Sequence, residues 1–274
     1  MIAVVLGLAS GLSWGVADFF GGLASRRASA LAVVAVGQAV GLALALAVLA
    51  VVRPDVPPAR EFLLAFAAGL SGVLGLMAFY RAMAIGSMSI IAPVSALGAL
   101  VPVTVDLAAG RAPGSVVLAG MALALAGAIL AARAPGPASR QGVGLALVAA
   151  LGFGGFFSLL AEGAEESALW ALIAARLASV PVALVVVAVL GVGLVLRGRV
   201  LIMTAVGGTL DAAANLMFAA GSQRGLTSVV AVLGSLYPVT TVALAGIVLH
   251  ERLGPLQAAG GGVALAGVAM IAAG

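Results

Sequence analysis

The sequence contains no cysteine, no lysine and only one histidine, His250. The absence of cysteine excludes disulfide bonds, thiolate metal sites and cysteine nucleophiles. A single histidine leaves little for a metal centre, so we expect neither a metal nor another cofactor. Charge is scarce as well: the 13 basic residues are all arginines, and charged residues occupy only 8% of the 274 positions.

Apolar residues are correspondingly abundant. They make up 64% of the chain, whereas a soluble domain is roughly half apolar and one-quarter charged. A bilayer core about 30 Å thick needs about 20 apolar residues per helical span, and nearly the whole chain divides into segments of that length. We therefore predict an integral membrane protein whose surroundings are the lipid bilayer, with no separate soluble domain.

Ten apolar segments are separated by arginine, proline, glycine and acidic residues. The first has no basic region before its apolar run, so we expect a retained span and not a cleavable signal peptide. The connections are short, and the polar connection at 133–140 lies at the middle of the chain. The predicted spans are 2–24, 29–52, 62–83, 88–109, 115–132, 141–161, 168–195, 200–220, 227–249 and 255–273.

The two halves of the chain resemble each other weakly but in order. The segment 79–92 (FYRAMAIGSMSIIA) aligns with 218–231 (FAAGSQRGLTSVVA) at an offset of 139 positions. Two five-helix halves joined directly must enter the membrane from opposite sides, because five is odd. The fold class we predict is an all-α polytopic membrane protein, with residues 1–136 and 137–274 as two inverted five-helix repeats, an architecture typical of alternating-access transporters.

Several short motifs stand out along the chain, namely Trp14-Gly15, Phe79-Tyr-Arg-Ala82, Ser89-Ile-Ile-Ala-Pro93, Ser235-Leu-Tyr-Pro238 and Leu249-His-Glu-Arg252. In their order, these motifs resemble the EamA family of the drug/metabolite transporter superfamily. This resemblance implies a ten-helix secondary transporter, often an exporter of amino acids, other metabolites or drugs, in the inner membrane of a bacterium. The family usually carries Gly-Glu-Arg at the end of the fourth and ninth helices; here the first copy is only Gly110-Arg111.

In the first span, small and polar residues share one face of the predicted helix. At 100° per residue, Trp14 and Asp18 fall on the side of Gly7, Gly11 and Gly15, opposite the bulky apolar residues. Ionisable residues inside spans normally face the bundle interior or a cavity. We expect Asp18 to face a cavity, where it either contacts substrate or the coupling ion, or makes a structural hydrogen bond. The glycine spacing is typical of close helix packing.

Three further spans carry candidate site residues. Asp211 and Asn215 in span 200–220 are four apart, so they can touch or share a ligand. An arginine inside span 168–195, Arg176, needs an anion, for which the candidates are Asp18, Asp211 or a substrate carboxylate. Gln38 aligns with Arg176 at an offset of 138, so the two halves present unequal chemistry at matching positions.

Other polar residues and prolines have less specific interpretations. Tyr80 and Arg81 are either substrate contacts or anchors at the membrane interface. We expect Asp106 and the cluster Glu162, Glu165 and Glu166 to be solvated at helix ends. Prolines inside spans free backbone carbonyls and allow bending, and the hinge candidates are Pro93, Pro102, Pro181 and Pro238.

The arginines also predict orientation. A net charge of +4 and a pI near 11.0 would indicate nucleic acid in a soluble protein, but here arginines stand between apolar runs, so no nucleic-acid partner is expected. Ten spans place both termini on one side. The loops of that side hold four arginines and the opposite loops hold eight, which predicts termini outside by the positive-inside rule.

Together these features predict an exporting secondary active transporter of small polar or amphipathic metabolites such as amino acids. Asp18 and Asp211 are the candidate sites for a coupling proton or cation, and Arg176 is the candidate anchor for a substrate carboxylate. One alternative is a broad exporter of lipophilic cationic drugs, in which Arg176 only balances one acid. A less favoured alternative is a membrane-embedded enzyme acting on a lipid-linked substrate. Both a monomer and a homodimer remain open.

Overall fold

The computed structural model describes residues 1–85, 91, 94–131, 141–248 and 254–274. These residues contain helices and irregular connections and no β-strand. A chain this apolar has to satisfy its backbone hydrogen bonds inside each spanning segment, and an α-helix does so. The predicted all-helical, multi-pass architecture is therefore confirmed.

The helices of the first half are α1 (Ile2–Ser25), α2 (Ala30–Val52), α3 (Ala59–Ile85), the 3₁₀ helix η1 (Leu97–Ala99), α5 (Leu100–Ala108) and α6 (Ser115–Ala131). Those of the second half are α7 (Val143–Gly163), α8 (Ala168–Val189), α9 (Gly198–Ser222), α10 (Thr227–Gly234), α11 (Tyr237–Val248) and α12 (Pro255–Ala273). Eight segments are long and apolar enough to cross a membrane, and residues 94–108 and 115–131 form shorter apolar helices. The count of ten spans stays a prediction.

Two predicted spans differ from the structure. The span 168–195 is too long, because α8 ends at Val189 and Gly191 adopts a φ of +64°, a left-handed conformation that ends the helix. The span 227–249 is broken into α10 and α11. Pro238 stands in the first turn of α11, where proline is tolerated, but its ring is incompatible with one helix that continues from α10.

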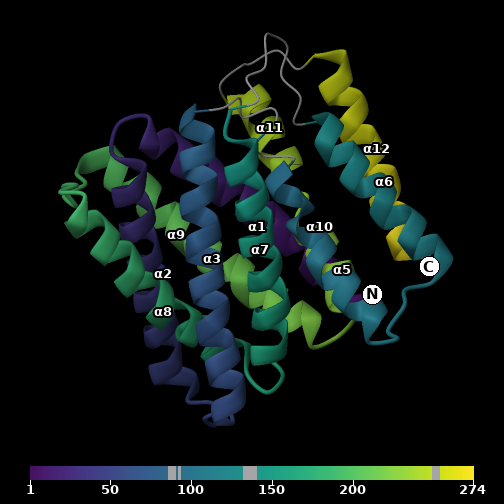
Figure 1. The fold of residues 1–274 in the computed structure, drawn as a ribbon, viewed down its shortest axis with the longest axis horizontal. Helices are drawn as coiled ribbons and strands as arrows, with labels where there is room; N and C mark the ends of the chain where they lie inside the picture. The colour runs from purple at the N-terminus through teal and green to yellow at the C-terminus, as the bar shows by residue number, and fades with distance from the viewer. Residues whose placement is uncertain (86–90, 92–93, 132–140, 249–253) are drawn as a thin grey trace.

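The two halves interlock in the helical bundle (Figure 1). Helix α1 packs against α9, α10 and α11, α2 packs against α8 and α9, and α3 packs against α7 and α8. Helices α6 and α12 form a separate outer pair. The glycines of α1 permit its close approach: a Cβ added at Gly11 would lie 2.6 Å from the carbonyl oxygen of Leu233. The close-packing interpretation of the glycine spacing agrees with this contact.

The alternating direction of the helices defines two ends of the bundle. The terminal end carries both termini, at the lower right of Figure 1, and the connections 53–58, 109–114, 164–167 and 223–226. The opposite end carries the connections 26–29 and 190–197. These two names are used below for the two faces of the protein that would meet water.

Candidate functional site

A central cavity lies between the helices of the two halves. Counted with the open space at its mouth, it has a volume of about 820 Å³. Its aromatic wall consists of Trp14, Phe79, Phe153, Phe156, Phe157 and Tyr237. Its polar side chains are Asp18, Gln38, Ser95, Arg176, Ser179, Asp211, Asn215 and Ser235. The arrangement suits a molecule with an apolar body and a charged group.

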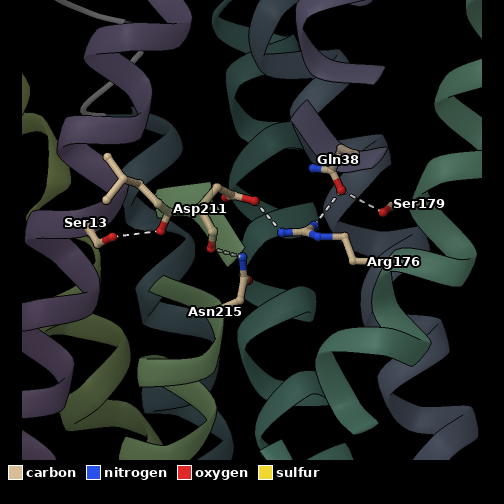
Figure 2. Close-up of polar contacts among 7 residues, drawn as sticks. Ser13, Gln38, Arg176, Ser179, Asp211 and Asn215 are labelled. Atoms are coloured by element: carbon tan, nitrogen blue, oxygen red, sulfur yellow. Dashed lines mark hydrogen bonds and ion pairs between the residues drawn. The ribbon is translucent and has the colours of Figure 1, made fainter. Parts of the chain in front are cut away.

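Arg176 is the centre of a polar network on one side of the cavity (Figure 2). It is 4% exposed, and its guanidinium donates hydrogen bonds to the Asp211 carboxylate and to the amide oxygen of Gln38. Ser179 donates a further hydrogen bond to the same Gln38 oxygen at 2.8 Å. Of the three anions considered from the sequence, Asp211 is the partner. Arg176 is thus neutralised by the protein itself.

Asp18 differs from Asp211 in having no such partner. Its side chain lines the central cavity, and no ion pair or hydrogen bond joins it to another residue that the structure describes. The helical pattern of the first span correctly predicted that Asp18 faces a cavity. An unpaired carboxylate in a largely apolar cavity is a site for a cation or a proton, because a charge there is poorly solvated.

Helix α9 is fixed beside α1 by local hydrogen bonds. Ser13 donates to the carbonyl oxygen of Leu210 at 2.7 Å, which holds α1 next to the turn that carries Asp211 (Figure 2). Asn215 donates from Nδ2 to the backbone oxygen of Asp211 at 2.6 Å. Its buried Oδ1 has no hydrogen-bond partner among the described residues. Asn215 thus lines the central cavity, while its unpaired Oδ1 is buried.

An aromatic cluster closes the cavity toward the terminal end. The rings of Trp14, Phe157 and Phe218 lie with centroids 5.1–5.9 Å apart. These rings come from α1, α7 and α9, and Phe218 is completely buried. Below them, Gly7 and Gly11 of α1 pack directly on Leu233. This cluster therefore borders the cavity on its side toward the terminal end.

Helix interruptions occur at matching positions of the two halves. Ser95 precedes the 3₁₀ helix η1, and Ser235 follows the end of α10. Both serines are fully buried and line the cavity, and 140 positions separate them. Interrupted helices at corresponding places in two repeats are typical of transporter binding sites. The sequence analysis missed these serines, although their shared offset was a detectable signal.

The remaining predicted site residues lie apart from this network. Arg81 is exposed near the end of α3 and does not line the central cavity. Pro102 is buried in α5, and Pro181 lies within the uninterrupted α8. Pro93, the side chain of Tyr80 and the motif around His250 lie outside the part of the chain that the structure describes.

The expectation that Asp106 is solvated at a helix end was wrong, because the residue is buried. It is 2% exposed, and its carboxylate accepts hydrogen bonds from Arg111 at 3.1 Å and from the backbone N–H of Ser228 at 2.8 Å. The latter residue lies in the first turn of α10, so Asp106 joins the two halves at the terminal end. In contrast, Glu162 is paired with Arg60 on the surface, where the two side chains are 43% and 67% exposed.

Known proteins show the same fold and the same sequence pattern. The sequence model of the EamA-like transporter family matches residues 1–133 and again residues 140–273. One solved crystal structure superposes with a TM-score of 0.82, covering 98% of this chain and 98% of that chain at 16% sequence identity. At this identity the likeness concerns the fold alone. No curated protein matches the sequence.

Proposed function

The chain belongs to the EamA-like transporter family, and on that basis we propose a secondary active transporter that moves a small amphipathic amine, amino acids included, by alternating access. Membership supports a multi-pass membrane transporter of the drug/metabolite superfamily, since the family consists of transporters. The substrate class, the direction and the coupling are our proposal, argued below from the cavity.

The unpaired Asp18 carries the proposal for the substrate. Three charged side chains line the central cavity, namely Asp18, Arg176 and Asp211. Because Arg176 pairs with Asp211, their charges cancel, and one negative charge remains at Asp18. A protonated amine complements this charge, and the aromatic wall suits the apolar body of such a molecule. A free anion, by contrast, would meet no unpaired positive charge there.

A broad exporter of lipophilic cations is the second candidate. The pairing of Arg176 with Asp211 favours it, because this is the arrangement expected if the arginine only balances one acid. An amino acid needs a partner for its carboxylate as well. The guanidinium of Arg176 has five N–H donors, of which one bonds to Gln38 and one to Asp211, so donors remain for that carboxylate.

The contacts between the halves support alternating access by two inverted repeats. Gln38 and Arg176 occupy matching positions and touch, and the helix interruptions at Ser95 and Ser235 also match. The aromatic cluster would then be the closed gate of this conformation, and its opening would expose the cavity to the terminal end. Transport requires that substrate binding changes the balance between two such states.

Proton coupling at Asp18 is part of the proposal. A proton and the substrate amine would compete for this carboxylate, so that uptake of one releases the other on each side of the membrane. Export and location in the inner membrane of a bacterium follow the resemblance to the family. The protein would act as a monomer or a homodimer, with no cofactor.

The test is uptake into proteoliposomes with an imposed pH gradient, because the exchange of one proton for one monovalent cation moves no net charge and gives no steady current. Wild type, Asp18→Asn and the control Asp55→Asn would be given radiolabelled apolar amino acids, their methyl esters or tetraphenylphosphonium. Asp55 lies exposed in the connection 53–58, so its neutralisation removes a charge away from the cavity. We expect gradient-driven uptake for wild type and Asp55→Asn, and loss of this uptake for Asp18→Asn.

The panel also separates the two candidates. Uptake of the amino acids but not of their methyl esters would support amino acid transport, since the ester keeps the amine but lacks the carboxylate. Uptake of both the esters and tetraphenylphosphonium would support the cation exporter. Equal uptake by wild type and Asp18→Asn would contradict the role of Asp18 in both.

A further inference from the structure

A second cavity adjoins the central one between α1, α2 and α9. Including the open space at its mouth, it has a volume of about 490 Å³. Its wall includes four glycines from these three helices, and we call it the glycine chamber. The glycines are Gly21, Gly37, Gly207 and Gly208.

The glycine chamber and the central cavity share one wall. Asp18, Gln38, Leu76 and Asp211 line both. The unpaired carboxylate of Asp18 is thus accessible from two compartments, an aromatic one and a smaller one. A ligand whose ammonium lies at Asp18 can extend into both compartments only if its nitrogen, or the carbon beside it, carries two arms.

The chemistry of the chamber suits an apolar arm. Besides the shared residues, its wall consists of glycine, alanine and valine together with Thr204. The hydroxyl of Thr204 already donates to the carbonyl oxygen of Val200 at 2.9 Å, and Thr204 is 2% exposed. In the part of the chamber away from the shared Asp18, Gln38 and Asp211, water would find few side-chain partners, whereas a short alkyl group would bury apolar surface there.

We propose that the glycine chamber is a second substrate compartment, which binds a short alkyl arm of a branched amine whose ammonium contacts Asp18 and whose larger body lies against the aromatic wall. This inference rests on the proposed amine transport. It specifies the substrate class further. The protein binds a secondary amine, or an amine with a branched carbon beside the nitrogen, more tightly than an unbranched primary amine that carries the same larger apolar group.

Single glycine substitutions can fill the chamber. A Cβ added at Gly21 meets no atom within 4 Å, and Gly21 lines the chamber, so Gly21→Leu is the substitution designed to fill it. Gly22 is the matched control, because its added Cβ also meets nothing within 4 Å, yet it lines neither cavity. Gly37→Ala is a smaller change, since its Cβ would lie 3.7 Å from Gly208 Cα, an ordinary contact.

The test is direct binding to the purified protein, measured by isothermal titration calorimetry in detergent. The probes are phenethylamine and N-butylphenethylamine. We expect wild type and Gly22→Leu to bind the N-butyl compound about tenfold more tightly than phenethylamine. Gly21→Leu should lose this preference while its affinity for phenethylamine stays unchanged, and Gly37→Ala should reduce the preference to an intermediate value.

The outcomes separate this inference from the proposed function. Equal binding of the two probes by wild type, or a preference that Gly21→Leu and Gly37→Ala both retain, would overturn the chamber proposal alone. Asp18→Asn serves as the control for the amine site itself. If neither probe binds wild type, or if Asp18→Asn binds both as wild type does, the amine site is refuted and the chamber proposal with it.

Discussion

Gln38 and Arg176 touch at the centre of the protein although 138 positions separate them. This separation is close to the offset at which the two halves of the sequence align, so the two residues occupy matching positions. In a two-fold arrangement, equivalent residues meet only near the axis. Their hydrogen bond therefore marks where such an axis would pass, and the chemistry there is asymmetric, an amide on one side and a guanidinium on the other.

The pairing of Arg176 with Asp211 predicts unequal effects of two substitutions. The side chain of Arg176 is 5% exposed and that of Asp211 is 31% exposed. Removing one partner of a buried pair leaves an uncompensated charge, and the cost is higher for the more deeply buried one. We expect Asp211→Asn, which isolates Arg176, to lower the free energy of unfolding by about 3 kcal/mol. Arg176→Gln should lower it by about 1 kcal/mol, because water reaches Asp211.

The double variant Arg176→Gln/Asp211→Asn removes both charges and completes the cycle. It should be more stable than Asp211→Asn alone, because no charge is left unpaired. Unfolding by denaturant in detergent micelles measures all four proteins. Strictly additive losses would show that the two side chains do not interact in the membrane protein.

Sequence periodicity predicted the inward-facing residues well. The 3.6-residue repeat of a helix fixes which side chains share a face, so Asp18, Asp211 and Asn215 were all placed on interior faces before the structure. The need of Arg176 for an anion was equally predictable from its position in an apolar span. Which anion would pair with it was not, because that choice depends on how α8 and α9 lie against each other.

Features that depend on contacts distant in sequence were missed. Asp106 looked solvated because it stands near the end of a helix beside glycine and arginine. Its burial comes from the first turn of α10, which is 122 positions away. Similarly, the hydropathy of residues 227–249 is continuous, so these residues were predicted as one span. Pro238 was named as a hinge candidate, but its place in the first turn of a new helix, α11, became evident only from the structure.

The buried hydrogen bonds of Asp106 predict a large effect on stability. Asp106→Ala removes the acceptor for Arg111 and for the backbone N–H of Ser228, and it leaves a buried donor unpaired. We expect a loss of about 2 kcal/mol. Glu162→Ala is the control, since its exposed pair with Arg60 should contribute less than about 1 kcal/mol. Equal thermal shifts for the two variants would contradict a structural role for Asp106.

The outer pair of helices predicts opposite effects of alanine at neighbouring glycines. A Cβ at Gly260 of α12 would lie 2.2 Å from the backbone nitrogen of Ala131 in α6, whereas a Cβ at Gly261 meets nothing within 4 Å. Gly260→Ala should therefore separate α6 from α12 and cost about 2 kcal/mol. Gly261→Ala should be neutral or stabilising by up to about 1 kcal/mol, because alanine favours the helix. The measurement is the thermal unfolding temperature of both variants. A Gly260→Ala variant as stable as wild type would contradict the close packing of α6 and α12.

The charges at the two ends of the bundle predict the orientation of the protein. Among the described residues, the opposite end carries Arg26, Arg27, Arg81, Arg197 and Arg199 and no acidic residue. The terminal end carries four arginines together with six acidic residues. By the positive-inside rule we expect the opposite end to be cytoplasmic and both termini to be outside. This orientation would direct the closed aromatic gate to the outside.

The absence of cysteine makes this orientation directly measurable, because single cysteines need no altered background. Ser29→Cys reports on the opposite end and Gly114→Cys on the terminal end, and both positions are exposed. In intact spheroplasts, a membrane-impermeant maleimide should label Gly114→Cys and leave Ser29→Cys unlabelled. Inside-out vesicles should give the reverse, which controls for the reactivity of each cysteine. Labelling of Ser29→Cys alone in spheroplasts would invert the assignment, and equal labelling of both would show that the charge asymmetry does not determine a single orientation.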